Sequence, residues 1–274
     1  MSTASRNFLS SLHTGSVMTQ TFGTDSTLER VHRLVSSAYA HNVLYETFLS
    51  CSTIRTYQVP GAHHGLVIFF AYQELNVHPT DKLWINTAHL GLPAPYCIVD
   101  IIVENPTRVV PSRLFIPYEG THRSEVALQQ TDMLPLFFVR SDGGVGIRVD
   151  DASMRLDVLP DGPTRIHAHS LKVVLHLVNY ELDERQIQLR TSPLAPNISI
   201  RRLARLIASK VRCFLKKAER DNATLARWED PRWKIGSGVG CIGAEDVMLL
   251  GIVFVSPGKV TPLLRVRDDY VFTI

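Results

Sequence analysis

The chain has 274 residues, of which 45% are hydrophobic and 20% charged, and it carries a formal net charge of +3 at pH 7. This length and composition exclude an intrinsically disordered chain and allow a substantial hydrophobic core. The longest apolar runs, residues 65–72 and 247–255, are far shorter than the roughly 20 residues that a membrane-spanning helix needs. We therefore expect no transmembrane segment and interpret both runs as buried strands.

The N-terminal region predicts a flexible tail followed by a helix. Residues 1–23 are rich in Ser and Thr and contain no acidic residue, and we expect them to form the tail. An organellar import signal is the alternative, although Arg6 is the only Lys or Arg in this segment. Ser26 and Glu29 have the spacing of a capping box, and apolar residues then recur at helical spacing to about Ala40.

From residue 53 onward the pattern changes to short strands bounded by Pro, Gly or Asn. Runs rich in β-branched and aromatic residues predict strands over residues 53–59, 66–72, 82–87, 96–103, 112–116 and 134–140. The pattern also predicts a hairpin over residues 146–159 and strands over residues 164–180, 186–190, 247–255 and 262–266. In the hairpin, Arg148 and Asp150 would face charges of opposite sign across the turn.

The order of these elements predicts the fold class. Strands and helices do not alternate, which disfavours a doubly wound parallel sheet. We predict an α+β fold: a mainly antiparallel β-sheet or sandwich with an N-terminal helix and a late basic amphipathic helix. Residues 24–274 would form a single β-rich globular domain, and a subdivision near residue 160 is the alternative.

Four cysteines lie far apart in the sequence, and none has Cys-x-x-Cys spacing: Cys51, Cys97, Cys213 and Cys241. Cys97 and Cys213 fall within apolar patterns, which predicts free thiols that behave as small hydrophobic side chains. Free thiols favour a reducing compartment over a disulfide framework. We therefore expect a soluble intracellular protein, cytoplasmic or nuclear.

Two motifs have the residue types of a cofactor site or a metal site, and we assign neither. Gly238, Gly240 and Gly243 have dinucleotide-fingerprint spacing, but such a site needs a preceding strand and a following helix, and here a β-rich run follows. His167 and His169 would share one face of a strand, yet zinc requires three or four ligands. We predict no catalytic residue, metal or cofactor. A hydrolase or transferase with a scattered active site is the alternative function, and these two histidines would be its first candidates.

The basic helix, residues 199–221, is the most unusual segment of the chain. It contains eight Lys or Arg against two acidic residues, a net charge of +6, which leaves the rest of the chain at −3. Ser199 is the expected N-cap. At about 100° per residue, one face is apolar, formed by Ile200, Leu203, Ala204, Ile207, Val211, Phe214, Leu215 and Ala218. The opposite face is cationic and comprises Arg201, Arg202, Arg205, Arg212, Lys216 and Arg220.

Two interpretations of the cationic face stay open. It is either the solvated side of a packed helix or a surface that docks a polyanion, an acidic protein or an anionic membrane surface, and an acidic protein partner is the most economical of these. Nucleic acid is a weaker candidate because the rest of the chain is net negative and no basic strand is interleaved with aromatic residues. Trp228 and Trp233, in the adjoining loop, would be aromatic anchors of the docking surface or covers of the sheet edge.

Three C-terminal segments resemble a group of uncharacterised proteins found in mushroom-forming fungi. They are residues 180–187, residues 196–214, and the series Trp233-Lys-Ile-Gly236, Asp246-Val-Met-Leu249 and Val255 to Leu264. This chain has Lys259-Val-Thr261 where that group usually has Ser-Trp-Gln. The resemblance implies a fungal intracellular β-rich protein and no catalytic residue. We therefore expect a non-enzymatic binding or scaffolding module, while enzymatic activity and the oligomeric state stay open.

Overall fold

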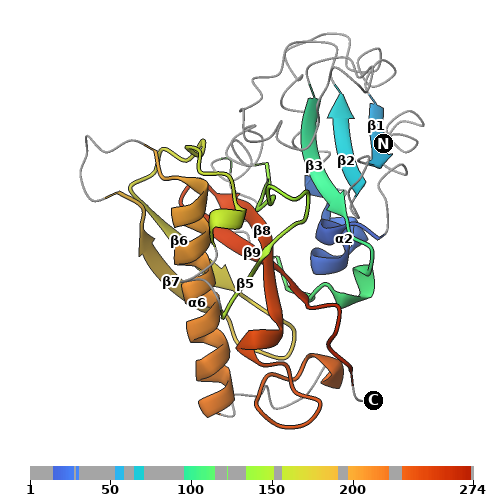
Figure 1. Cartoon of the computed structure of the whole chain (residues 1–274), viewed down its shortest axis with the longest axis vertical. Helices are drawn as coiled ribbons and strands as arrows, with labels where there is room; N and C mark the ends of the chain where they lie inside the picture. Colours follow the sequence, from blue (N-terminus) through green and yellow to red (C-terminus); the bar gives the residue numbers. More distant parts are fainter. Residues whose placement is uncertain are drawn as a thin grey trace.

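The described residues form a larger sheet, which one long helix covers, and a smaller sheet beside it (Figure 1). The computed structural model describes residues 15–27, 29–30, 53–58, 65–70, 96–114, 122, 134–150, 156–190, 197–221 and 230–272. This arrangement is α+β and rich in strands, which confirms the predicted fold class. The strand predicted over residues 82–87 lies outside the described residues.

The larger sheet has six strands: β4 (Leu136–Phe137), β5 (Ile147–Arg148), β6 (Ser170–Leu175), β7 (Asp183–Gln188), β8 (Val247–Ser256) and β9 (Lys259–Val266). The strand order is β4-β8-β9-β6-β7, and β5 also pairs with β8. The sheet is mixed, because β6 and β9 run parallel while the other pairs are antiparallel. The hairpin of β8 and β9 is its centre, as the apolar run over residues 247–255 predicts.

Almost every residue of β8 is buried because the two faces of the β8–β9 hairpin contribute to different cores. One face enters the main core, which lies under the long helix and includes Val173, Ile187, Leu203, Ile207, Leu249 and Val260. This core takes residues from both sides of position 160. The other face enters the second core, which comprises Val17, Met18, Ile98, Ile101, Val103, Val109, Phe137, Val139, Val145, Leu250, Val253 and Leu263. A strand with two covered faces reads as a continuous apolar run.

The smaller sheet consists of β1 (Thr53–Gln58), β2 (Gly65–Phe70) and β3 (Tyr96–Ile102), paired antiparallel in that order. The short helix α2 (Val17–Phe22) packs next to β3 (Figure 1). The burial of α2 contradicts the prediction that the chain is a flexible tail up to residue 23. The first 14 residues of that predicted tail lie outside the described range. The polar composition is misleading here, because the hydroxyl of Thr21 donates to the Val17 carbonyl and so becomes buried with its hydrogen bond satisfied.

The helix predicted from Ser26 starts earlier in the structure. Residues 24–27 and 29–30 are helical and follow directly on Gly23, whose φ of 84° ends α2. Ser26 therefore lies inside the helical segment rather than at its cap. The predicted end near Ala40 lies outside the described residues.

The hairpin predicted over residues 146–159 is wrong. β5 has two residues and pairs with β8, and Leu156–Val158 forms a 3-10 turn, η5. Arg148 forms an ion pair with Asp150 of its own segment at 3.0 Å. The conformation of this segment depends on pairing with the long strand β8. The local alternation of apolar residues does not show that long-range pairing. Similarly, the strand predicted over residues 164–180 is restricted to β6, which begins at Ser170.

The long helix α6 (Ile200–Arg220) lies lengthwise over the larger sheet (Figure 1). All eight residues of its predicted apolar face are buried. The Ser199 side chain accepts a hydrogen bond from the Arg202 backbone N–H at 3.4 Å, which confirms the predicted N-cap. None of the described helices is long and apolar enough to cross a membrane.

Candidate functional site

The helix α6 carries the candidate site on the side that faces away from the sheet. Arg202, Arg205 and Lys216 are exposed and Arg212 is half-buried. At about 100° per residue, these four side chains fall within less than a quarter of the helix circumference. We call them the cationic stripe, and it extends about 21 Å along the helix. Within the described part of the chain, none of the four side chains has an ion pair or a hydrogen bond.

Two cations of the predicted face have hydrogen-bond partners within the chain. Arg201 donates from Nε to the Leu159 carbonyl at 2.6 Å and from Nη2 to the Asp157 carbonyl at 3.1 Å. It therefore fastens the start of α6 to η5 rather than facing a partner. Arg220 donates to Asp221 at 2.8 Å, and this bond lowers the pKa of Asp221 below its usual value. Asp221 thus compensates the charge of Arg220. In the described part of the chain, the cations of the predicted face that have no such partner are the four of the cationic stripe.

Helix electrostatics make the N-terminal end of the stripe unfavourable in isolation. The first turn of α6, which the structure describes completely, contains no acidic residue. Arg202 is instead the third residue after the Ser199 cap, close to the positive end of the helix dipole. Along the helix, Arg202 and Arg205 are spaced i, i+3 and Arg212 and Lys216 i, i+4, so like charges are neighbours. An anion docked along this face would relieve both repulsions.

The predicted tryptophan anchors are not supported where the structure describes them. Trp233 is only 6% exposed, and its ring packs edge-to-face on Phe272 with centroids 5.7 Å apart. The Arg232 guanidinium covers it at 5.2 Å. Trp233 is therefore a core residue, which corrects its assignment as an anchor, and Trp228 lies outside the described residues.

The two histidines do not gather a metal site. His167 and His169 are both exposed, and the described residues contain no group of three side chains that could hold a metal ion. The backbone carbonyl of His169 accepts a hydrogen bond from Leu189 at 2.8 Å, so this segment extends the β6–β7 pairing. The Gly-rich segment is a loop closed by the bridge between Ile235 and Ile242, and strand β8 follows it after one 3-10 turn.

Cys213 contradicts its predicted burial. Its side chain is exposed, and its free thiol lies on the stripe side of α6 between Ser209 and Lys216. Cys213 precedes the apolar residue Phe214 in the sequence, but its side chain lies on the opposite side of the helix. Cys241 is a second free thiol, half-buried in the Gly-rich loop.

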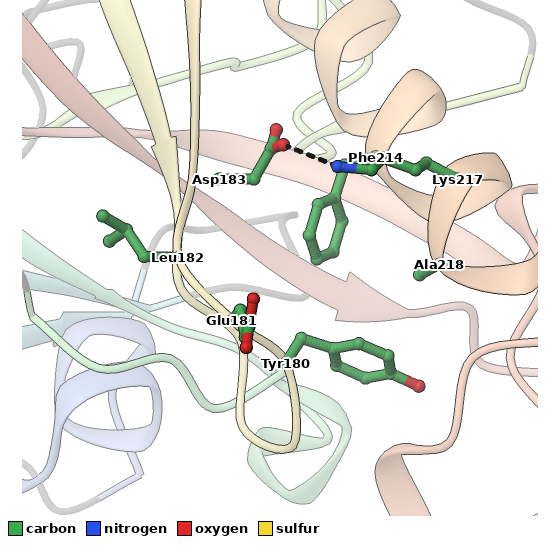
Figure 2. A pocket seen from close by; sticks show the side chains of 7 residues that line it. All are labelled: Tyr180, Glu181, Leu182, Asp183, Phe214, Lys217 and Ala218. Atoms are coloured by element: carbon green, nitrogen blue, oxygen red, sulfur yellow. Dashed lines mark ion pairs between the residues drawn. The ribbon is translucent and has the colours of Figure 1, made fainter. Parts of the chain in front are cut away.

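A cavity of about 250 Å³ between the start of β7 and the C-terminal half of α6 escaped the sequence analysis. Its lining residues are Tyr180, Glu181, Leu182, Asp183, Phe214, Lys217 and Ala218 (Figure 2). Lys217 reaches across from α6 and its Nζ lies 3.8 Å from an Asp183 oxygen. The only sequence signal is that Phe214 and Ala218 share one helix face, and it does not show what faces them.

Comparison with known proteins assigns neither a family nor a function to this chain. The chain matches no protein-family model, no curated protein and no solved structure.

Proposed function

We propose that this protein is a non-enzymatic binding module that docks an acidic segment of a partner protein on its cationic stripe. The single observation that carries the proposal is the absence, among the described residues, of any ion pair to Arg202, Arg205, Arg212 or Lys216. A helix of 21 residues presents these charges on an ordered backbone, so little backbone order has to be gained on binding.

The cost of the stripe in the isolated protein supports this function. Like charges at i, i+3 and i, i+4 spacing destabilise a helix by a few tenths of a kcal/mol per pair. The position of Arg202 near the positive helix end adds about 0.3–1 kcal/mol. A surface that only needed solvation would be served better by alternating charges. An acidic partner compensates both terms and explains why they are tolerated.

An acidic protein fits the stripe better than nucleic acid does. Nucleic-acid surfaces usually combine cations with exposed aromatic rings on which bases stack. The exposed large apolar side chains of the described residues are Leu182, Val239 and Val271, none of them aromatic. The chain outside residues 199–221 is also net negative. Its field would repel a long polyanion beyond the stripe.

The thiols support a location inside the cell. Cys213 is exposed and free, and Cys241 is half-buried and free. Exposed thiols persist in reducing compartments. We therefore propose that the protein acts in the cytoplasm or nucleus. The alternative hydrolase or transferase would not use a metal held by His167 and His169, because the described residues contain no group of three side chains that could hold a metal ion.

The test measures binding of fluorescein-labelled decaglutamate by anisotropy at low and at physiological ionic strength. We expect the variant R202Q/R205Q/R212Q/K216Q to bind between about fourfold and several hundredfold more weakly, since each of the four exposed ion pairs contributes about 0.2–1 kcal/mol. The matched variant R202K/R205K/R212K keeps the charges and should retain most of the affinity. Equal binding by the Gln variant and the wild type, both with unchanged melting temperatures, would show that the stripe is only a solvated face.

A further inference from the structure

We propose that the cavity between β7 and α6 binds a free α-amino acid with an apolar side chain. This small-molecule site is separate from the cationic stripe and does not rest on the function proposed above. None of its lining residues belongs to the stripe, although Lys217 lies on the same helix. The size, the floor and the rim of the cavity each point to this class of ligand.

The size of the cavity selects a small ligand. Its volume of about 250 Å³ lies below the roughly 300–1,000 Å³ of sites for drug-sized molecules and nucleotide cofactors. At about 30 Å³ for each water molecule in the liquid, it holds about eight waters. That space corresponds to a single amino acid rather than to a peptide or a nucleotide.

The floor of the cavity is a preformed aromatic corner. The rings of Tyr180 and Phe214 pack edge-to-face, with centroids 6.0 Å apart and an interplanar angle of 80°. The Tyr180 hydroxyl accepts a hydrogen bond from the Ile235 backbone N–H at 2.6 Å, which fixes the ring. Ala218 also lines the cavity, from the same helix as Phe214 (Figure 2). Both rings are almost fully buried, whereas Leu182 is 41% exposed, so an apolar ligand side chain would cover mainly Leu182 and the remaining edges of the rings.

The rim of the cavity carries charges of both signs, the Glu181 carboxylate and the Lys217 ammonium, which forms a long ion pair with Asp183. Glu181 is exposed and, in the described part of the chain, has no hydrogen bond or ion pair. Asp183, in contrast, is held by the Arg185 guanidinium through two hydrogen bonds. Lys217 lies 3.8 Å from Asp183, which is too long for a hydrogen bond, and its side chain is 52% exposed. The Lys217 ammonium therefore keeps its donors available for a ligand.

Charge balance at this rim favours a zwitterion. A simple amine bound near Glu181 would place a second ammonium beside Lys217. A simple carboxylate bound near Lys217 would add a third acid beside Glu181 and Asp183. An α-amino acid satisfies both groups at once, since its ammonium pairs with Glu181, its carboxylate accepts from Lys217, and its side chain enters the aromatic corner.

The experiment titrates the ¹⁵N-labelled full chain with three ligands and follows amide shifts around residues 180–183 and 214–218. The ligands are L-phenylalanine, phenethylamine, which lacks the carboxylate, and 3-phenylpropionate, which lacks the ammonium. We expect saturable shifts with phenylalanine and at least about tenfold weaker binding of the other two, because each loses one charge-assisted hydrogen bond.

Two variants then assign the two ends of the ligand. E181Q should weaken phenylalanine and leave 3-phenylpropionate unchanged or improved, while K217M, which retains the alkyl chain, should weaken phenylalanine and spare phenethylamine. The matched controls E219Q and R220M remove charges from the same helix end outside the cavity and should bind phenylalanine like the wild type. The proposal would be overturned if all three ligands bound equally well, or if E219Q and R220M weakened phenylalanine as much as E181Q and K217M do. It would also be overturned if phenylalanine caused no amide shift up to its solubility. None of these outcomes changes the decaglutamate test of the stripe, in which Glu181 and Lys217 are left intact.

Discussion

Asp100 of β3 accepts the backbone N–H of Met18 on both of its carboxylate oxygens, at 2.9 and 3.1 Å, across 82 positions of sequence. The same carboxylate accepts the Ile101 N–H at 2.8 Å. It thus satisfies free donors at the start of α2 and fastens this helix to the smaller sheet. The carboxyl is fully buried, and burial raises its pKa to about 7 although hydrogen bonds from Ser16, Met18 and Ile101 act in the opposite direction.

This buried carboxyl makes stability depend on pH. The pKa of Asp100 rises from 3.8 to about 7 on folding, so between these values the folded protein binds more protons than the unfolded chain. Its contribution to stability is therefore fully present below about pH 4 and is lost as the pH rises through about 7. We expect the unfolding free energy to fall over this interval by up to about 4 kcal/mol relative to D100N, in which position 100 cannot titrate. Urea denaturation of both proteins across this range measures the difference, and parallel pH profiles would contradict it.

The dipole argument at the start of α6 predicts a gain of stability together with a loss of binding. R202E places an acid near the positive helix end, and we expect it to raise the unfolding free energy by about 0.3–1 kcal/mol. The same variant should lose most of its affinity for decaglutamate. R220E is the matched control at the other helix end, where an acid opposes the dipole and also loses the bond to Asp221, so it should be less stable than the wild type. A destabilised R202E would argue that Arg202 makes a stabilising contact within the protein.

Arg201 should separate structural from docking cations. Its guanidinium bonds to the Leu159 and Asp157 carbonyls, so R201Q is expected to lower the unfolding free energy by about 1–2 kcal/mol. Its effect on decaglutamate binding should be small. R205Q removes a charge of the stripe from the same helix and should show the converse, unchanged stability and weaker binding. Thermal unfolding and anisotropy on the two variants decide the assignment, and equal losses of affinity would place Arg201 in the docking surface.

Close packing at Gly251 predicts a site that cannot accept a side chain. A Cβ there would lie 2.5 Å from the Leu136 carbonyl oxygen and 2.9 Å from Phe137 Cα, both in the neighbouring strand β4. We expect G251A to destabilise the protein by about 1–3 kcal/mol, because backbone atoms must move. G258A, in the turn between β8 and β9, meets nothing within 4 Å and should be close to neutral. Denaturant titration of the two variants tests this, and similar midpoints would show that β4 yields freely.

Elements with a long, strong pattern could be predicted from the sequence. The face of α6 and the run that forms β8 are clear because each buries many apolar residues at its own period. β4 and β5 lie within segments with a strand pattern, but each has only two residues and pairs with β8, and the local pattern shows neither this length nor this partner. The cavity depends on where Tyr180 and Phe214 meet in space. The exposure of Cys213 and the burial of Trp233 could not be predicted for a related reason, since the composition near an element does not show which side is covered.

The order of the sequence has a consequence for synthesis on the ribosome. The second core joins Val17 and Met18, near the start of the chain, to Leu250, Val253 and Leu263 of β8 and β9. Every other member of that core leaves the ribosome before this hairpin does. α2 and β3 must therefore keep apolar surface uncovered until translation has passed residue 263, and exposed surface of this kind is where nascent chains aggregate or recruit chaperones.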